Sequence, residues 1–243
     1  MRPRLRWLAL LGVAFLALQL FFVARIALMV VVDPQSTTFE RSEAWRILNS
    51  KGALPWRQQW VPYAQISDHL KRAVIASEDD GYTMHDGVDW NALEKAWAKN
   101  SRAEEQASRR AAARKGQVAN PKVVGGSTIT QQLAKNLFLS GERTLLRKGQ
   151  ELVLTMLLEA LLDKRRILEI YLNNVEWGEG VFGAQAAAAH YYRKSASGLS
   201  AAEAARLAVM LPRPRYFEKL PNSAYVAGRA GTIMARMADA RLP

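Results

Sequence analysis

The sequence predicts a mainly α-helical domain that follows one N-terminal membrane-spanning helix. Residues 7–32 form an apolar run that only Gln19 and Arg25 interrupt seriously. Beyond this run, apolar residues recur mostly at intervals of three and four, the period of an amphipathic helix. No segment alternates between apolar and polar residues well enough to require a sheet. These observations together predict the all-α class.

The apolar run is long enough to cross a bilayer, which takes roughly 20 apolar residues. A cleaved signal peptide is the alternative, but its apolar core would span only about 7–15 residues before a small-residue cleavage site. No convincing cleavage site follows the run, and Arg2, Arg4 and Arg6 precede it. The positive-inside rule then predicts residues 1–32 as a cytoplasmic N-terminus and uncleaved anchor, with residues 33–243 as a domain outside the cytoplasm.

The charge of the chain indicates which partners to expect. The 243 residues carry a net charge of +12 and include no cysteine, which excludes disulfides and thiolate metal ligands. Four of the 34 basic residues and none of the 22 acidic ones lie in residues 1–32, so the remaining domain has a net charge of +8. Such a domain is attracted to anionic lipid headgroups. Nucleic acid is the competing partner for positive charge, and an outward-directed domain argues against it.

The first half of the domain is expected to contain short helices between irregular segments. Residues 33–60 read as a connector of mixed polarity, broken at Pro34 and Pro55. Helical spacing then predicts a helix that ends at Glu78, from the recurrence of Ile66, Leu70, Ala73, Val74 and Ser77.

A short helix is expected over residues 91–98. Residues 101–122 are rich in Ala, Arg, Glu, Gln and Lys with almost no large apolar residue, so they should add little to a core. A mobile segment and, for its first half, a solvated charged helix both fit this composition.

The sequence of the second half of the domain predicts a succession of helices. Residues 145–162 should form a strong helix, whose nearly all-round apolar character over 152–158 predicts a central, buried position. Ser200 and Glu203 make a capping-box pattern that opens a later helix, and Pro212 and Pro214 should end it. The remaining helices are expected over residues 164–173, 184–192, 200–210 and 225–240.

The most informative segment is the polar run 125–136, with the sequence GGSTITQQLAKN. Gly125 and Gly126 allow close approach of the backbone to another group. The hydroxyls, amides and lysine that follow offer many hydrogen-bond donors at once, more than a buried core needs. This combination suits a ligand rich in phosphate or sugar better than it suits a packing surface.

Five segments, in order, resemble the family 51 glycosyltransferases, the peptidoglycan glycosyltransferases that polymerise lipid II. They are Glu78-Asp79 with His85 and Gly87, the polar run through Asn136, residues 147–151 with Leu158-Glu159, residues 167–173 with Gly178 and Gly183, and residues 211–214. Tyr82 departs from the phenylalanine usual in the family. The resemblance covers most of the chain beyond the anchor and implies a lysozyme-like helical catalytic domain. Because the sequence stops at Pro243 without a penicillin-binding transpeptidase domain, it looks like the monofunctional biosynthetic kind.

The chemistry that the resemblance implies is a displacement at C1 of a sugar held on a lipid pyrophosphate. The leaving pyrophosphate is already a stable anion, so it needs neighbouring cations rather than an acid. The attacking hydroxyl is a poor nucleophile and needs a base within hydrogen-bond reach. The resemblance makes Glu78 this base, which deprotonates the acceptor's 4-hydroxyl. A surface glutamate in an acidic loop is the structural alternative.

The same resemblance assigns the polar run to substrate binding. Lys135 and Arg143 are expected to stabilise the donor pyrophosphate, with ordinary solvated charge as the alternative. The groups expected to bind sugar and phosphate oxygens are Ser127, Thr128, Thr130, Gln131, Gln132 and Asn136. For Ser127 or Thr128 a helix N-cap is the alternative, which would also direct backbone N–H groups at an anion.

A second set of residues is expected to support the site. Asp79 should hold the loop or orient the base, and His85 should bond the backbone of that loop. Lys148 and Glu151 are spaced as an i,i+3 helical pair, and the resemblance makes Glu151 a second catalytic carboxylate that orients substrate or cations. Asn173 is expected to shape the wall of the cleft.

The implied partners are lipid II, the growing glycan strand, the inner membrane with the domain on its periplasmic side, and other cell-wall synthesis proteins. No cofactor and no protein metal site is expected, although Mg²⁺ or Mn²⁺ at the pyrophosphate is compatible with the chemistry. Two other functions stay open: a glycan-cleaving enzyme, which would use two carboxylates around one sugar bond, and a non-catalytic membrane-anchored scaffold. A domain starting near Gln35 is expected to fold without the anchor.

Overall fold

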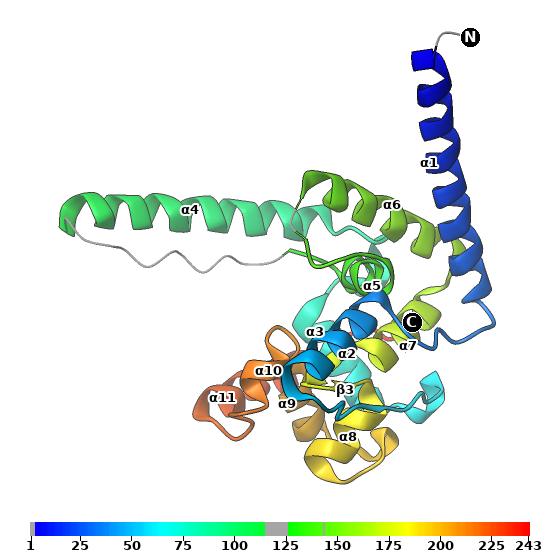
Figure 1. Cartoon of the computed structure of the whole chain (residues 1–243). Coiled ribbons are helices and arrows are strands. Elements are labelled where there is room, and N and C mark those ends of the chain that lie inside the picture. The colour runs from blue at the N-terminus through cyan, green and yellow to red at the C-terminus, as the bar shows by residue number, and fades with distance from the viewer. Residues whose placement is uncertain (1–2, 115–125, 143) are drawn as a thin grey trace.

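The computed structural model describes residues 3–114, 126–142 and 144–243, and they are mainly helical, which confirms the predicted class (Figure 1). In chain order the α-helices are α1 (Pro3–Leu28), α2 (Thr38–Lys51), α3 (Asp68–Glu78), α4 (Trp90–Arg114), α5 (Ile129–Phe138), α6 (Leu145–Leu161), α7 (Lys164–Asn174), α8 (Ala184–Tyr192), α9 (Ala201–Met210), α10 (Pro214–Phe217) and α11 (Ala224–Arg236). Short 3₁₀ turns are η1 (Tyr63–Gln65), η2 (Tyr82–Met84) and η3 (Ala196–Gly198).

Helix α1 extends away from the body of the protein, and only its C-terminal end packs against the body (Figure 1). Its residues Arg6–Leu28 form the one helical segment among the described residues that is long and apolar enough to span a membrane. At its end, Phe22, Ile26 and Met29 are buried, and the Phe22 ring meets the edge of Phe138 of α5 with centroids 5.4 Å apart. The end of the expected anchor is therefore part of the hydrophobic core.

The body is organised around α3 and α5. Helix α3 packs against α9 and α11, while α5 packs against α2, α6 and α7. The largest buried side chains between these helices include Tyr82, whose hydroxyl donates to the Lys164 carbonyl (2.6 Å), and Trp177, whose indole N–H donates to the Leu207 carbonyl (3.1 Å). This packing brings the end of α3 beside the start of α5, where the candidate site lies.

Several predicted helices are confirmed. Helix α3 ends at Glu78, and α7 and α8 lie where they are expected. The capping box of Ser200 and Glu203 opens α9, while α11 ends a turn earlier than predicted. Pro214 lies in the first turn of the short α10.

The connector expected over residues 33–60 was wrong in one respect, because it contains the helix α2. A capping box starts this helix: the Thr37 hydroxyl accepts from the Glu40 N–H (3.0 Å) and the Glu40 carboxylate accepts from the Thr37 N–H (2.7 Å). Gly52 ends it in the left-handed conformation, with φ of 66°. Both signals are readable in the sequence.

A small sheet was also missed. Strands β1 (Arg57–Gln58), β2 (Glu176–Gly178) and β3 (Val181–Phe182) form it in the order β1-β3-β2, with β2 and β3 antiparallel and β1 added parallel to β3. Strands of two or three residues are too short to show alternation, so periodicity cannot reveal them.

Two helices differ from expectation in length or burial. Residues 90–114 form the single long helix α4, which projects from the body (Figure 1). Of the two alternatives for residues 101–122, the structure therefore shows a helix over 101–114. Helix α6 is not buried all round. Leu154 and Leu158 lie in the core, but Leu145 and Leu146 are 91% and 88% exposed, and Leu152, Val153 and Met156 are exposed with them. Its second apolar face therefore stays partly exposed.

Candidate active site

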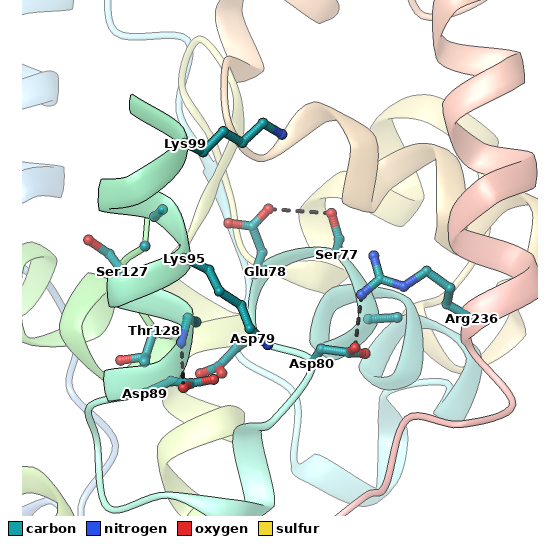
Figure 2. Close-up of a pocket in the computed structure, with 14 residues that line it drawn as sticks. Ser77, Glu78, Asp79, Asp80, Asp89, Lys95, Lys99, Ser127, Thr128 and Arg236 are labelled. Atoms are coloured by element: carbon teal, nitrogen blue, oxygen red, sulfur yellow. Dashed lines mark hydrogen bonds and ion pairs between the residues drawn. The ribbon is translucent and has the colours of Figure 1, made fainter. Parts of the chain in front are cut away.

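Glu78 is the last residue of α3 and lies at the edge of a cavity of about 320 Å³ (Figure 2). The Gln132 side-chain amide donates to Glu78 Oε2 (3.0 Å), and the Ser77 hydroxyl donates to Oε1 (3.4 Å). Burial raises the pKa of the Glu78 carboxyl, and the two hydrogen bonds oppose this shift. A carboxylate with a raised pKa is a stronger base than an exposed glutamate.

Gln132 lies on the first turns of α5, between Glu78 and the core. The hydroxyl of the buried Tyr171 donates to Gln132 Oε1 (3.0 Å), which leaves the amide NH₂ to face Glu78. The predicted candidates Glu78 and Gln132 are thus adjacent, although they are 54 residues apart in the chain.

Asp79 joins the end of α3 to the start of α5. Its Oδ2 accepts from the Ile129 N–H (2.9 Å), and its Oδ1 is bonded to His85 Nε2 (2.8 Å). The carboxylate is buried at the N-terminus of α5, where a negative charge is favourable. His85 was expected to bond the loop backbone and instead bonds this side chain, because the buried carboxylate needs a donor for its second oxygen.

Thr128 is the N-cap of α5, which is the structural alternative considered for it. Its hydroxyl accepts from the Gln131 N–H (3.2 Å), while the Gln131 side chain accepts from the Thr128 N–H (3.1 Å). The Thr128 hydroxyl also donates to the Gly87 carbonyl (2.6 Å). Gly87 has φ of +85°, and a Cβ there would lie 2.7 Å from Thr155 Cγ2. The loop after α3 is therefore clamped between α5 and α6.

The other residues of the polar run face different ways. Thr130 is fully buried and donates to Glu159 Oε1 (2.5 Å), which Lys164 also reaches (2.8 Å). Ser127 is exposed and borders the cavity, and Asn136 is half-buried. Substrate contact by Thr128, Thr130 and Gln131 stays a prediction, since their side chains already bond within the protein.

A cationic group lies along α5 and α6. Glu151 is buried and pairs with Arg147 (Nη1–Oε2 2.8 Å) and with Lys148, so the predicted i,i+3 pair is confirmed. Lys135 makes no ion pair with a residue that the structure describes. Desolvation lowers the pKa of the Lys135 ammonium, and the charges of Glu151 and Glu78 oppose this shift. Arg143, predicted as its companion, lies outside the described residues.

Asn173 is buried away from solvent and ties α7 to the segment before α3. Its Oδ1 accepts from the Val61 N–H (2.9 Å), and its Nδ2 donates to the Val61 carbonyl (3.0 Å) and to the Glu169 carbonyl (2.9 Å). These three bonds use most of what the amide offers. Asn173 is not among the described residues that line the cavity, so the expectation that it shapes the wall of the cleft stays a prediction, as does substrate contact.

Sequence reasoning missed several residues that line the cavity. Figure 2 shows Lys95 and Lys99 of α4 on one wall, and Asp80 paired with Arg236 of α11 on another (3.0 Å). The i,i+4 spacing of the two lysines places them on one helix face and was available in the sequence. Within the described residues, no group of three or more His, Cys, Asp or Glu side chains is arranged to hold a metal ion.

Comparison with known proteins places these residues in a family. The model of the family described as Transglycosylase matches residues 49–238. The chain belongs to this family. The five segments noted in the sequence all lie within the matched range, and the match begins near the end of α2 and ends just beyond α11.

Similar transglycosylases match almost the whole chain. The biosynthetic peptidoglycan transglycosylase of Burkholderia thailandensis is 54% identical over 242 residues, covering 98% of this chain and 88% of that protein. The protein of the same name from Herminiimonas arsenicoxydans is 50% identical over 244 residues, covering 100% of this chain and 99% of that protein. The one from Paraburkholderia phytofirmans is 50% identical, covering 98% and 94%. This transglycosylase is a glycosyltransferase of peptidoglycan synthesis.

Proposed function

We propose that this transglycosylase polymerises lipid II into linear glycan strands and releases undecaprenyl pyrophosphate. The observation that carries the proposal is the position of Glu78, a carboxylate of raised pKa at a cavity edge. Lys135, which forms no ion pair with a described residue, is among its charged neighbours. A base and a nearby cation are the two groups that displacement of a pyrophosphate requires.

In the proposed step, the acceptor's 4-hydroxyl oxygen forms a bond to donor C1 while the bond from C1 to the pyrophosphate oxygen breaks. The hydroxyl proton passes to the Glu78 carboxylate, and the pyrophosphate leaves with the bonding electrons. Attack opposite the leaving group inverts the configuration at C1. Gln132 holds the carboxylate in place through its bond to Oε2.

The leaving pyrophosphate is proposed to meet Lys135 and Lys148, with Arg143 as a further cation. Glu151 pairs with Arg147 and Lys148, so its role in this proposal is to position the cations rather than to transfer a proton. Mg²⁺ or Mn²⁺ bound to the pyrophosphate itself is a separate proposal, which a chelator in the assay would test.

We further propose that residues 1–32 anchor the enzyme in the inner membrane and that residues 33–243 work in the periplasm. The apolar span Arg6–Leu28, the exposed apolar face of α6 beside α1 and the net charge of +8 on the domain support this pose. It places the cavity near the headgroups, where the sugars of a lipid-linked substrate lie.

Glycan cleavage is the second candidate reaction, because helical, lysozyme-like folds serve both synthesis and cleavage. A hydrolase needs two carboxylates around the sugar bond. The carboxylate next to Glu78 is Asp79, and its two oxygens are already bonded to Ile129 and His85. This arrangement favours transfer over hydrolysis.

The test is to incubate the purified full-length protein with lipid II and with preformed glycan separately. We expect lipid II to be converted into glycan polymer with release of lipid pyrophosphate, and preformed glycan to stay intact. Shortening of the glycan would favour the hydrolase, and no change in either substrate would favour the non-catalytic scaffold.

A further inference from the structure

Gln19 is a polar residue near the middle of the apolar span of α1. Of the two residues that interrupt this span seriously, Arg25 lies near its end, where a long side chain can reach the headgroups. Gln19 lies nine residues before Leu28, about 14 Å along the helix at 1.5 Å per residue. An amide at this depth is costly unless another group satisfies its hydrogen bonds.

The partner of Gln19 is Gln150 of α6. The Gln19 Nε2 donates to Gln150 Oε1 (3.4 Å), and the Gln150 Nε2 donates to Gln19 Oε1 (3.3 Å). Both side chains are half-buried, and α1 packs against α6. Each amide thus gives the other one donor and one acceptor. The result is a reciprocal pair between the anchor and a helix of the body, 131 residues apart in the chain.

The amide pair lies at membrane depth in the pose proposed above. From Arg6 to Gln19 the helix rises only about 20 Å, which is less than the roughly 30 Å of a bilayer's hydrocarbon core. With Arg6 at the cytoplasmic edge, Gln19 and Gln150 therefore lie inside the apolar layer. No water is available there to replace a lost partner, so each amide depends on the other.

The start of α6 carries cations that the proposed function assigns to the donor. Glu151 directly follows Gln150 and pairs with Arg147 and Lys148. The charges of all three residues act on the Lys135 ammonium of α5. One charged cluster therefore joins α5 and α6, and its geometry depends on where the start of α6 lies.

Few other contacts hold the first turns of α6. Leu145 and Leu146 are almost fully exposed, and a Cβ added at Gly149 would meet open space. The buried residues of the helix begin at Glu151. Within the described ranges, the pair with Gln19 is the one hydrogen bond from residues 145–150 to another element. The anchor thus supplies the polar contact that fixes this part of α6.

We propose that Gln19 is a positioning residue for the donor side of the site. Its pair with Gln150 holds the start of α6 and so keeps Lys148 and Glu151 at a fixed distance from Lys135. This inference rests on the proposed function and deepens it, because it gives the anchor a part in donor binding besides attachment. Gln19 acts through α6, so its loss should weaken donor binding and leave kcat and acceptor binding unchanged.

The experiment measures transfer by the full-length enzyme in lipid nanodiscs, with donor and acceptor varied separately. The donor is a labelled lipid-linked glycan strand whose terminal 4-hydroxyl is blocked, so that it can only donate, and the acceptor is lipid II. We expect Gln19→Leu to raise the donor KM about 3–20-fold, the range for hydrogen bonds between membrane helices. The kcat and the acceptor KM should stay unchanged.

Two further variants test whether the pair acts as one contact. Gln150→Leu should raise the donor KM as Gln19→Leu does, and the double variant should raise it no further, because the second substitution removes nothing that is left. Leu20→Ala alters an exposed neighbour on α1 and is the matched control, with kinetics like those of the wild type.

A second measurement tests the contact itself. The chain has no cysteine, so Gln19→Cys/Gln150→Cys places the only two thiols at the pair. A short bifunctional thiol reagent should join them within one chain, as read by mass spectrometry, and the linked enzyme should recover the wild-type donor KM. The same variant capped with a monofunctional reagent should keep the raised KM. Leu20→Cys/Gln150→Cys is the matched control and should link poorly.

Four results would overturn the inference. They are an unchanged donor KM, an equal rise in donor and acceptor KM with a lower melting temperature, linkage no better than that of the Leu20 control, and a linked enzyme that keeps the raised donor KM. Failure of the proposed function would look different. The wild-type enzyme would then transfer nothing although the link still forms, and the role in donor binding would fall with that function.

Discussion

At the scale of single residues, opposing effects set the pKa of Glu78, the candidate base. Burial raises the pKa of Glu78, while the bonds from Gln132 and Ser77 favour the charged form, and burial is the larger effect. Tyr171 fixes Gln132 from the core side, so the carboxylate has one defined donor. Removing the charge of Glu78 should therefore change reactivity far more than structure.

We expect Glu78→Gln to lower glycan polymerisation about 10²–10⁴-fold, the usual loss when a general base is removed. The folded state holds a proton on Glu78 more tightly than the unfolded chain does, so ionisation above the raised pKa destabilises the fold. The neutral glutamine avoids this cost, and the melting temperature at neutral pH should not fall. Polymerase activity within a few-fold of wild type would remove Glu78 from the role of base.

The pH dependence of wild-type kcat/KM should report the ionisation of Glu78. Because the base must be deprotonated, kcat/KM should be high above the raised pKa and fall as the pH drops through it. The acid limb is expected above the ordinary glutamate value of 4.5. A limb at or below that value, measured with the fold intact by circular dichroism, would contradict the raised pKa.

Lys135→Ala should weaken use of the donor. The side chain makes no ion pair in the described part of the chain, so the melting temperature should stay within about 2 °C. Loss of one charge-assisted contact should raise the donor KM about tenfold. Lys219→Ala is the matched control, and a large drop in melting temperature with unchanged kinetics would show that Lys135 is structural.

At the scale of elements, the start of α5 connects the site to the fold. Its capping box, the Thr128–Gly87 bond and the Asp79–Ile129 bond all meet within its first turn. The polar run 125–136, which first suggests a ligand site, therefore also contains the start of α5. Several of its polar groups hold this helix start in place.

Thr128→Ala should destabilise the protein by about 1–2 kcal/mol, because it removes an N-cap. For a chain of this size, that lowers the melting temperature by roughly 2–8 °C. Thr128→Ser keeps the hydroxyl and is expected to retain most of the stability. Equal melting temperatures for the alanine and serine variants would show that the hydroxyl contributes little.

Elements with several turns and a clear cap could be predicted from the sequence, as α3 and α9 show. Other features depend on tertiary contacts that one sequence does not display. The sheet has strands of two or three residues, and the second apolar face of α6 resembles a buried one in composition. In the site, Glu78 and Gln132 were found through motifs, whereas Lys95 and Lys99 reach the cavity only because Gly126 lets α4 approach α5.

At the scale of the whole molecule, the end of α1 and the helical body are one packed unit. Besides the burial of Phe22, Ile26 and Met29, the Arg166 guanidinium donates to the Met29 carbonyl (2.8 Å) and pairs with Asp33 (2.7 Å). The direction of α1 relative to the cavity is therefore set by the fold and not by a loose tether. A domain starting near Gln35, which is expected to fold without the anchor, therefore lacks core contacts that the full chain has.

Two truncations separate anchoring from packing. Deleting residues 2–18 removes most of the span but keeps Phe22, Ile26 and Met29, and deleting residues 2–32 removes these as well. Burial of such side chains contributes about 1.5–3 kcal/mol each, and each kcal/mol shifts the melting temperature by about 2–4 °C in a chain of this size. We expect the shorter deletion to melt near the full-length protein in detergent and the longer one at least about 10 °C lower.

Both deletions should use lipid II in liposomes poorly. The residual vesicle binding of the shorter deletion should weaken as salt rises, because a Debye length of about 8–10 Å screens the charged surface. Equal melting temperatures for the two deletions would mean that α1 serves only to anchor, and full activity of either on liposomes would show that the anchor is dispensable for reaching the substrate.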